Sequence, residues 1–149
     1  MMSIRVRSAN AADAPQLITL IHDHAAFEQT MATISKDQLT KILVSHDPPV
    51  RLFVAENQQE AVGYAAATLD FSTWRASYWM HLDCLFVRSE WHGNGIGKRL
   101  LEYVANDAIH SGADRLEWQT PQWNADAIQF YHSLGALSAI KARFWRPLR

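Results

Sequence analysis

The chain has 149 residues, of which 48% are hydrophobic and 19% charged, and its formal net charge is −1 at pH 7. This length and balance predict a single globular domain over residues 1–149 and exclude a disordered chain. A net charge near zero argues against nucleic acid as the main partner, because a phosphate backbone attracts a basic surface.

The first half of the chain is expected to form two helices and three strands. Asn10 caps the first helix, whose apolar face extends to Ala25. Ser35 and Gln38 form the capping box of a short second helix. The expected strands are Ile4–Arg7, Arg51–Glu56 and Ala61–Leu69. The last two flank the polar turn of residues 57–60 and should form a hairpin.

The second half is expected to contain a strand–helix–strand unit. The longest strand runs from Tyr78 to Val87, and a helix from Ile96 to about Ser111 leads to a strand at Arg115–Thr120. Two strands joined through a helix pair in parallel by a right-handed crossover. Asn124 caps a last helix, and Ala136–Leu148 is expected to hold one or two closing strands. The prediction is an α/β fold, flanked by helices, whose mostly antiparallel sheet has one central parallel pair.

The lack of a long apolar run, the single cysteine and the scattered histidines bear on where the protein is located and whether it binds a metal. The chain has no apolar run of membrane-spanning length and no signal-peptide pattern at its start, so we expect no membrane partner. Its one cysteine, Cys84, excludes an internal disulfide framework and favours the cytoplasm. The seven histidines are scattered. His22 and His24 lie two positions apart on an expected helix and do not share a face, so we predict no metal site.

A glycine-rich stretch at the start of the Ile96 helix carries the strongest functional signal. It reads His92-Gly93-Asn94-Gly95-Ile96-Gly97-Lys98. Glycine lets another molecule approach the backbone closely, and the first amides of a helix attract phosphate. The alternative is an ordinary surface turn. A P-loop is excluded because Arg99 stands where Ser or Thr is required, and the third glycine of a dinucleotide fingerprint is missing.

Two motifs in the second half resemble those of the GCN5-related N-acetyltransferases (GNAT family). The first is the glycine loop, and the second reads Asn124-Ala125-Asp126-Ala127-Ile128-Gln129-Phe130-Tyr131-His132-Ser133-Leu134-Gly135. Within the family the chain is most similar to the spermidine/spermine and thialysine N-acetyltransferases. That likeness rests on Phe27-Glu28, Trp74, Leu82-Asp83, Phe86-Val87, Trp123-Asn124 and Leu134-Gly135-Ala136.

The resemblance implies a GNAT fold and acetyl-CoA as cosubstrate. It implies that His92–Lys98 hold the pyrophosphate, that Asn124 contacts CoA, and that the Tyr131 hydroxyl lies beside the sulfur. It also implies that Phe86 and Val87 pair with the pantetheine and that an amide near Leu85 binds the oxyanion. A homodimer is expected, with the partner contributing to the acceptor pocket.

Acetyl transfer to an amine requires a base, because an alkylamine is protonated at neutral pH. Asp83 is the candidate base, either directly or through a water, and Tyr131 is the candidate acid for the leaving thiolate. Glu28 is expected to attract the amine, and Trp74 to wall the acceptor site. Each residue has a structural alternative: Asp83 and Glu28 as solvated surface acids, Tyr131 as a core residue, and Trp74 as a lid over the core.

Three positions depart from the pattern of the resembling enzymes. His92 stands where Arg or Gln is usual, which changes a side chain and leaves the amides in place. Cys84 and Ser72 replace acids of the polyamine enzymes, so the charge that would bind a long polycation is reduced.

The sequence therefore predicts an acetyl-CoA-dependent N-acetyltransferase that acts on the primary amine of a small molecule. The expected acceptor is polyamine-like, thialysine-like or another amine. The alternatives are an acetyltransferase of protein or peptide amino groups and a non-catalytic acyl-CoA-binding module.

Overall fold

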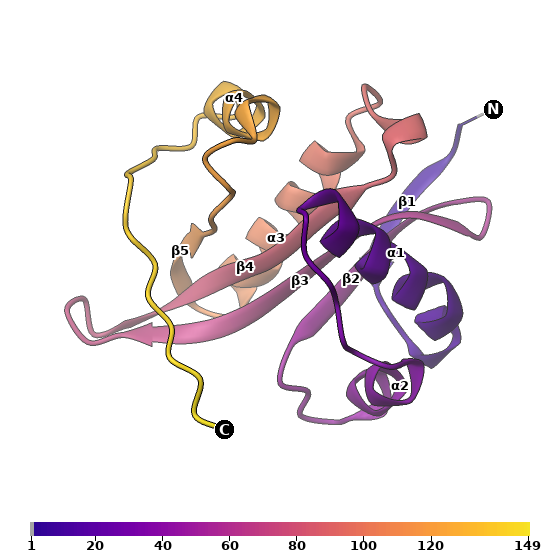
Figure 1. The fold of residues 1–149 in the computed structure, drawn as a ribbon, viewed down its shortest axis with the longest axis horizontal. Helices are drawn as coiled ribbons and strands as arrows, with labels where there is room; N and C mark the ends of the chain where they lie inside the picture. The colour runs from indigo at the N-terminus through magenta and orange to yellow at the C-terminus, as the bar shows by residue number, and fades with distance from the viewer. Residues whose placement is uncertain (1) are drawn as a thin grey trace. The chain divides into compact units, whose positions relative to one another are not determined.

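A computed structural model describes residues 2–149, which form two compact units divided between Gln119 and Thr120. The first unit is a sheet with three helices (Figure 1). Its strands are β1 (Ile4–Ser8), β2 (Arg51–Asn57), β3 (Glu60–Ser72), β4 (Ser77–Val87) and β5 (Ala113–Glu117), and its helices are α1 (Ala14–Phe27), α2 (Lys36–Val44) and α3 (Ile96–His110). The second unit contains α4 (Ala125–Ser133) and an extended segment after it.

The strands follow one another across the sheet in chain order, from β1 to β5. The first three pairings are antiparallel, and β4 pairs with β5 in parallel through α3. This arrangement confirms the expected mixed α/β fold. At 13 residues, β3 is longer than β4 at 11, so the expectation that Tyr78–Val87 is the longest strand was wrong.

The closing strands expected within Ala136–Leu148 do not form, and the parallel pair therefore lies at one edge of the sheet. A strand needs a partner for its backbone N–H and C=O groups, and apolar residues alone do not supply one. The apolar side chains of this segment, including Leu137, Phe144 and Trp145, are exposed.

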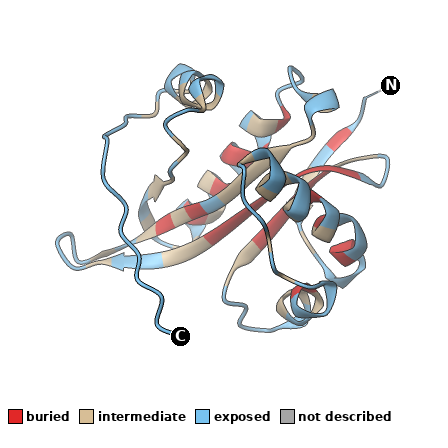
Figure 2. Cartoon of the chain, in the orientation of Figure 1, coloured by how far each residue is buried: buried red, intermediate tan, exposed pale blue. Residues whose placement is uncertain are grey.

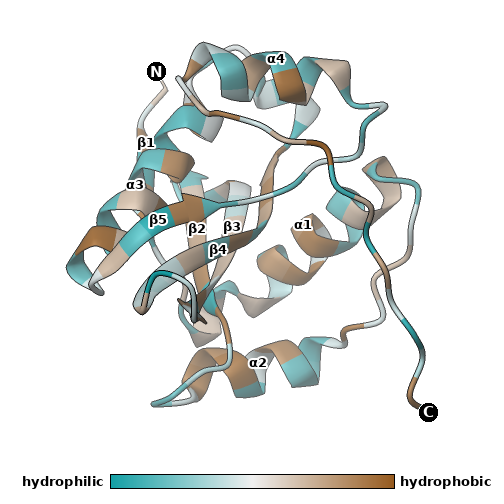
Figure 3. Ribbon diagram, turned by 90° about the vertical axis from the view of Figure 1, so that its left-hand side faces the viewer, coloured by the Kyte–Doolittle hydropathy of each residue, from teal (hydrophilic) through white to brown (hydrophobic). Residues whose placement is uncertain are grey.

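The sheet of the first unit has helices on both faces (Figure 1). On one face, α1 and α2 bury a cluster that includes Leu17, Leu39, Val54 and Tyr64. On the other face, the ring of Phe53 in β2 lies 5.6 Å from that of Tyr103 in α3. Buried residues follow the strands in Figure 2. In Figure 3 the helices carry both hydrophobic and hydrophilic residues, as expected for helices with one face on a sheet.

Capping follows the sequence closely, with one difference at the first helix. Ser35 and Gln38 form the predicted capping box of α2. Asn10 caps a 3-10 turn at Ala11–Asp13 instead of α1 itself, which begins at Ala14. Pro15 explains the shift: its ring lacks an N–H group and has a fixed φ, so it is favoured in the first turn of a helix.

Candidate active site

The loop between β4 and α3 has its backbone exposed at two glycines. Gly93 and Gly95 have φ of +80° and +73°, a conformation that costs other residues about 1–2 kcal/mol. A Cβ atom at either position would meet nothing within 4 Å. The glycines are therefore required by the backbone conformation, and the space above them is open to a ligand.

The N-terminus of α3 begins directly at this loop. Gly95 is its N-cap residue and, among the described residues, no side chain caps it. The Arg99 N–H donates to the Gly95 carbonyl at 3.1 Å. The N–H groups of Ile96, Gly97 and Lys98 come earlier in the helix and have no carbonyl four residues back within it. Uncapped amides at the positive end of a helix dipole fit a pyrophosphate group.

Two side chains fix the shape of the loop. His92 Nε2 lies 2.7 Å from the Val87 carbonyl, and because a carbonyl only accepts, Nε2 carries the proton. Asn94 Nδ2 donates to the Trp91 carbonyl at 3.0 Å and to the His92 carbonyl at 3.3 Å. His92 therefore ties the loop to the end of β4.

The two basic residues in the first turn of α3 differ in their surroundings. Arg99 Nη2 donates to the Ile4 carbonyl at 2.8 Å, which ties α3 to β1. Lys98 is more than half exposed, with Nζ 3.9 Å from Glu102 Oε1. Of the two, Lys98 is the one with an accessible charge beside the loop.

Asp83 occupies a β-bulge in the middle of β4. Cys84 pairs with Ala66 and Leu82 with Ala67, so the extra residue Asp83 has no partner in β3. Beyond the bulge, the alternation of β4 side chains between the two faces of the sheet is shifted by one residue. Cys84 packs on the cluster under α1, and the bulge leaves the Asp83 side chain 61% exposed.

Beyond the bulge, β4 has one open edge. On one side it pairs with β3 as far as Val87. On the other side, its described pairing with β5 ends at His81 opposite Glu117. Alternate backbone groups of Leu85, Phe86 and Val87 therefore point to an edge where no described strand pairs with them. This is the segment that the resemblance to the GNAT family implies pairs with the pantetheine of CoA.

Glu28 lies just past the end of α1 and contacts a buried polar cluster that residue spacing did not predict. His24 Nδ1 lies 2.7 Å from the Tyr64 hydroxyl, and His24 Nε2 lies 3.7 Å from Glu28 Oε1. Cys84 belongs to the same cluster, and its thiol donates to Asp83 Oδ2 at 3.6 Å. The available sequence signal was the i,i+4 spacing of His24 and Glu28.

Burial controls the protonation of this cluster. It lowers the pKa of His24, raises that of Tyr64 and raises that of Cys84 to about 12, so the thiol is neutral at pH 7. The charges of Asp83 and Glu28 also raise the pKa of Cys84. The two carboxylates therefore lie near the same buried groups.

Trp74 lies at the far end of the β3–β4 hairpin from Asp83. It lies in the turn between β3 and β4 and is 99% exposed. Asp83 is six positions beyond Ser77 in β4, which corresponds to roughly 20 Å at about 3.3 Å per residue. Ser72, at the end of β3, lies at the same distant end of the hairpin.

Asn124 and Tyr131 belong to the second unit. Asn124 Oδ1 accepts from the Ala127 N–H at 3.2 Å, which confirms Asn124 as the cap of α4. Tyr131 lies in the last turns of α4, with its ring centroid 5.3 Å from that of Phe130.

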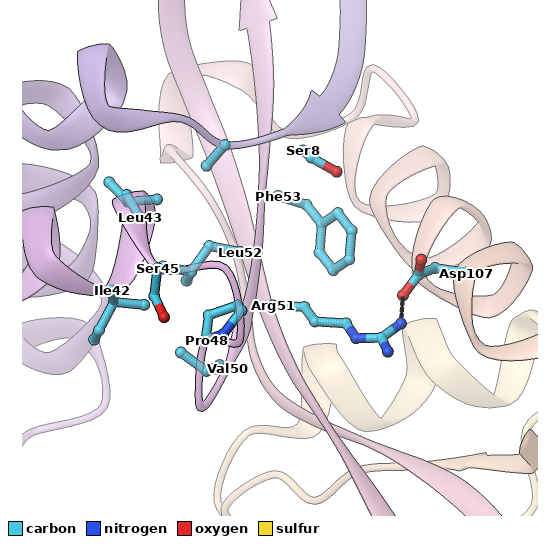
Figure 4. A pocket seen from close by; sticks show the side chains of 11 residues that line it. Ser8, Ile42, Leu43, Ser45, Pro48, Val50, Arg51, Leu52, Phe53 and Asp107 are labelled. Carbon is cyan, nitrogen blue, oxygen red and sulfur yellow. Dashed lines mark hydrogen bonds and ion pairs between the residues drawn. The ribbon is translucent and has the colours of Figure 1, made fainter. Parts of the chain in front are cut away.

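A groove of about 370 Å³ lies away from the glycine loop (Figure 4). It runs between the end of α2, the start of β2 and Asp107 in α3, which pairs with Arg51 at 2.7 Å. None of the predicted site residues lines it.

Within residues 2–149, no three His, Cys, Asp or Glu side chains are placed to hold a metal ion. The helices described are all too short or too polar to cross a membrane.

The sequence model of the acetyltransferase (GNAT) family matches residues 16–136, which is most of the chain. The chain belongs to the GNAT family. The resemblance drawn from the glycine loop and the Asn124–Gly135 motif is thereby confirmed. The class of the protein is that of the acetyl-CoA-dependent N-acetyltransferases.

Curated GNAT relatives match over nearly the full chain. The thialysine N-ε-acetyltransferase of Caenorhabditis elegans is 27% identical over 100% of this chain and 92% of its own length. The enzyme of the same name from Bos taurus is also 27% identical, over 100% and 93%. The L-ornithine N5-acetyltransferase of Arabidopsis thaliana is 25% identical, over 91% and 80%.

Solved structures support the fold. An aminoglycoside acetyltransferase from an uncultured soil metagenomic sample, in complex with sisomicin, has a TM-score of 0.82 at 21% identity, over 98% of this chain and 97% of the other. An aminoglycoside N-acetyltransferase in complex with CoA has a TM-score of 0.81 at 18% identity, over 100% and 97%.

Proposed function

We propose that this GNAT member acetylates the primary amine of a small molecule by direct attack in a ternary complex. The observation that carries the proposal is the bulge in β4, which presents Asp83 on the strand that leads into the phosphate-binding loop. Asp83 takes a proton from the acceptor ammonium. The Tyr131 hydroxyl gives a proton to the departing thiolate, as the resemblance implies.

The donor side of the proposal rests on the loop and on the edge of β4. Acetyl-CoA supplies the acetyl group as a thioester. The amides of residues 93–98 hold its pyrophosphate, supported by the open space over Gly93 and Gly95. The open edge at residues 85–87 binds the pantetheine, the amide near Leu85 binds the oxyanion, and Asn124 adds a contact to CoA.

The acceptor side rests on Glu28 and Asp83. Both carboxylates act on the same buried cluster, so together they form an anionic site for an ammonium group. Cys84 adds no charge, because its thiol stays protonated at neutral pH. This favours an acceptor with one or two amines, such as thialysine or L-ornithine, over a long polyamine.

We further propose that residues 1–149 act as one acetyltransferase domain in a cytoplasmic homodimer. Trp74 lies too far along the hairpin to reach the Asp83 of its own chain. A second copy that brings its hairpin to the site would allow Trp74 to wall the acceptor pocket.

Amine-dependent release of free thiol from acetyl-CoA tests the function. The panel contains thialysine, L-ornithine, spermidine, an aminoglycoside, free amino acids and peptides with free amino groups. Fastest turnover with a small monoamine or diamine supports the proposal. Fastest turnover with peptides supports the protein acetyltransferase alternative, and binding of acetyl-CoA without turnover of any amine supports the non-catalytic module. Either of these two results overturns the proposal.

A further inference from the structure

The last turn of α1 places an imidazole between two aromatic rings of the sheet. The His24 ring stacks on Phe86, with centroids 5.1 Å apart and planes 20° apart. It meets the Tyr64 ring edge-on at 5.6 Å and 71°. Tyr64 and Phe86 are partners across β3 and β4. With a side chain only 12% exposed, His24 is held in one orientation between these rings.

The two nitrogens of His24 face different groups, and this favours one tautomer. Nε2 faces the Glu28 carboxylate, with Oε1 3.7 Å away, and the negative charge there favours the proton on Nε2 over Nδ1. Burial favours the neutral ring by lowering the pKa of His24, so Nδ1 is left as an acceptor. The Tyr64 hydroxyl, 2.7 Å away, donates to it. Tyr64 therefore donates to His24, and the Nε2 N–H group of His24 faces the Glu28 carboxylate.

Glu28 stands at the end of this series of contacts, and its side chain is 34% exposed to solvent. The charged and titratable groups that act on His24 are Glu28, just past the end of α1, and Asp83 from β4, with the Tyr64 hydroxyl from β3 as its hydrogen-bond partner. Without His24, the Glu28 carboxylate would lose the N–H group that holds it on the side of the cluster shared with Asp83.

We propose that His24 is a positioning residue, which holds the Glu28 carboxylate beside Asp83 so that the two bind the acceptor ammonium. This proposal rests on the proposed function, because it assigns His24 a role at the same amine site. His24 does not contact the reacting atoms. Its substitution should therefore raise the KM for the amine and leave kcat and the KM for acetyl-CoA nearly unchanged.

Two substitutions of His24 separate its two contacts. In His24→Asn, the amide oxygen lies near the position of Nδ1 and can accept from Tyr64, while nothing reaches Glu28. In His24→Gln, the longer side chain places an N–H donor near the position of Nε2. We expect His24→Asn to raise the KM for thialysine about tenfold, and His24→Gln to return it to within about threefold of wild type, with acetyl-CoA saturating throughout.

The decisive kinetic comparison is whether the effects of substituting His24 and Glu28 on the KM for the amine are additive. In a Glu28→Gln background, adding His24→Asn should change the KM for thialysine less than twofold, because both substitutions remove the same interaction. His22→Asn is the control, since His22 is exposed on the same helix and its Nε2 donates to the Ile34 carbonyl at 3.1 Å, away from Glu28. Independent, multiplying effects of His24→Asn and Glu28→Gln would overturn the proposal. So would a wild-type KM in His24→Asn.

A spectroscopic readout tests the proposal without relying on turnover. Long-range proton–nitrogen NMR of histidine-labelled protein, assigned with His24→Asn, should show His24 neutral with the proton on Nε2 at pH 7. Glu28→Gln should move its ring nitrogen shifts, and His22→Asn should not. A proton on Nδ1 in the wild type overturns the proposal even if no amine is acetylated. The Nε2 proton together with no turnover of any amine would contradict only the proposed function.

Discussion

Asp83 is exposed because one extra residue in β4 interrupts its pairing with β3. Cys84 pairs with Ala66, and both lie on the face of the sheet under α1. Leu82 pairs with Ala67, the next residue of β3, whose side chain points to the opposite face. An exposed carboxylate in mid-strand has no role in the core, and its neighbours His81 and Cys84 are both within 4 Å of it. At this scale the proposed chemistry depends on two groups, Asp83 and Tyr131.

Asp83→Asn removes the proposed base and keeps the shape of the side chain. General base catalysis contributes about 10²–10⁴-fold to a rate, so kcat should fall by about 10²-fold or more. Steady-state kinetics measure this effect, and calorimetry should show acetyl-CoA affinity unchanged. Asp70→Asn, an exposed acid on β3, is the control and should keep wild-type kcat. A kcat within twofold of wild type in Asp83→Asn would remove Asp83 from the mechanism.

Tyr131→Phe removes only the proposed acid hydroxyl. Loss of the proton donor to the thiolate should lower kcat by about 10²-fold while acetyl-CoA binding stays nearly unchanged. The matched control is Tyr103→Phe, whose ring packs on Phe53 on the α3 face of the sheet. Undiminished turnover in Tyr131→Phe, or an equal loss in Tyr103→Phe, would contradict the assignment.

At the scale of elements, α3 shows how the same backbone conformation can serve two purposes. Gly95 precedes the helix with φ +73°, and Gly112 follows it with φ +81°. A Cβ atom would meet nothing within 4 Å at either position. Gly112 ends the helix, whereas Gly95 also belongs to the proposed pyrophosphate site.

Gly95→Ala should therefore be compared with Gly112→Ala. Both substitutions place a Cβ atom in a left-handed conformation and should each reduce the free energy of unfolding by about 1 kcal/mol. Only Gly95→Ala should weaken acetyl-CoA binding, because relief of its backbone strain displaces the amides of the loop. Calorimetric titration and urea unfolding of both variants measure the two effects. Equal acetyl-CoA affinity in the two variants would exclude a binding role for the loop conformation.

At the scale of the whole molecule, a partly buried ion cluster ties β1 to β2 and to the turn before α1. Arg7 makes two hydrogen bonds to Asp13, at 2.7 and 2.8 Å, and pairs with Glu56 at 2.8 Å. Asp13 is buried and also accepts from the Asn10 N–H at 2.7 Å. The hydrogen bonds from Arg7 are the main cause that lowers the pKa of Asp13 below its ordinary value of 3.8.

Asp13→Asn should destabilise the fold in a pH-dependent way. We expect a loss of about 2 kcal/mol at pH 7, less than the 3–5 kcal/mol of a fully broken buried pair, because Arg7 keeps Glu56. The folded pKa of Asp13 lies below its unfolded value, so its contribution is complete well above pH 3.8 and is lost as the pH falls through the folded pKa. Urea unfolding at pH 7 and pH 3 should show the deficit shrinking at pH 3.

Asp107→Asn is the control for this prediction. Asp107 pairs with Arg51 at 2.7 Å, but both side chains are more than 30% exposed. Such a pair contributes less than about 1 kcal/mol. A deficit in Asp13→Asn that stays constant between pH 7 and pH 3, or that Asp107→Asn matches, would contradict the account of the cluster.

Local signals made most of the fold predictable. Capping boxes, the hairpin turn and the glycines that flank α3 each act within a few residues, and the structure confirms their elements. The bulge at Asp83 and the pairing of His24 with Tyr64 depend on strand register and on packing between distant segments, which residue spacing does not reveal. The prediction of closing strands was wrong because the apolar residues in 136–148 form a strand only where another strand offers an edge to pair with.

The central claim is that this GNAT member transfers acetyl groups to small amines. The most direct test incubates the wild-type protein with acetyl-CoA and a mixture of thialysine, L-ornithine and a lysine-containing peptide, and identifies the acetylated products by mass spectrometry. The account predicts that thialysine or L-ornithine is acetylated first and that Asp83→Asn forms little of the same product. Acetylated peptide as the main product, or no acetylated amine at all, would contradict it.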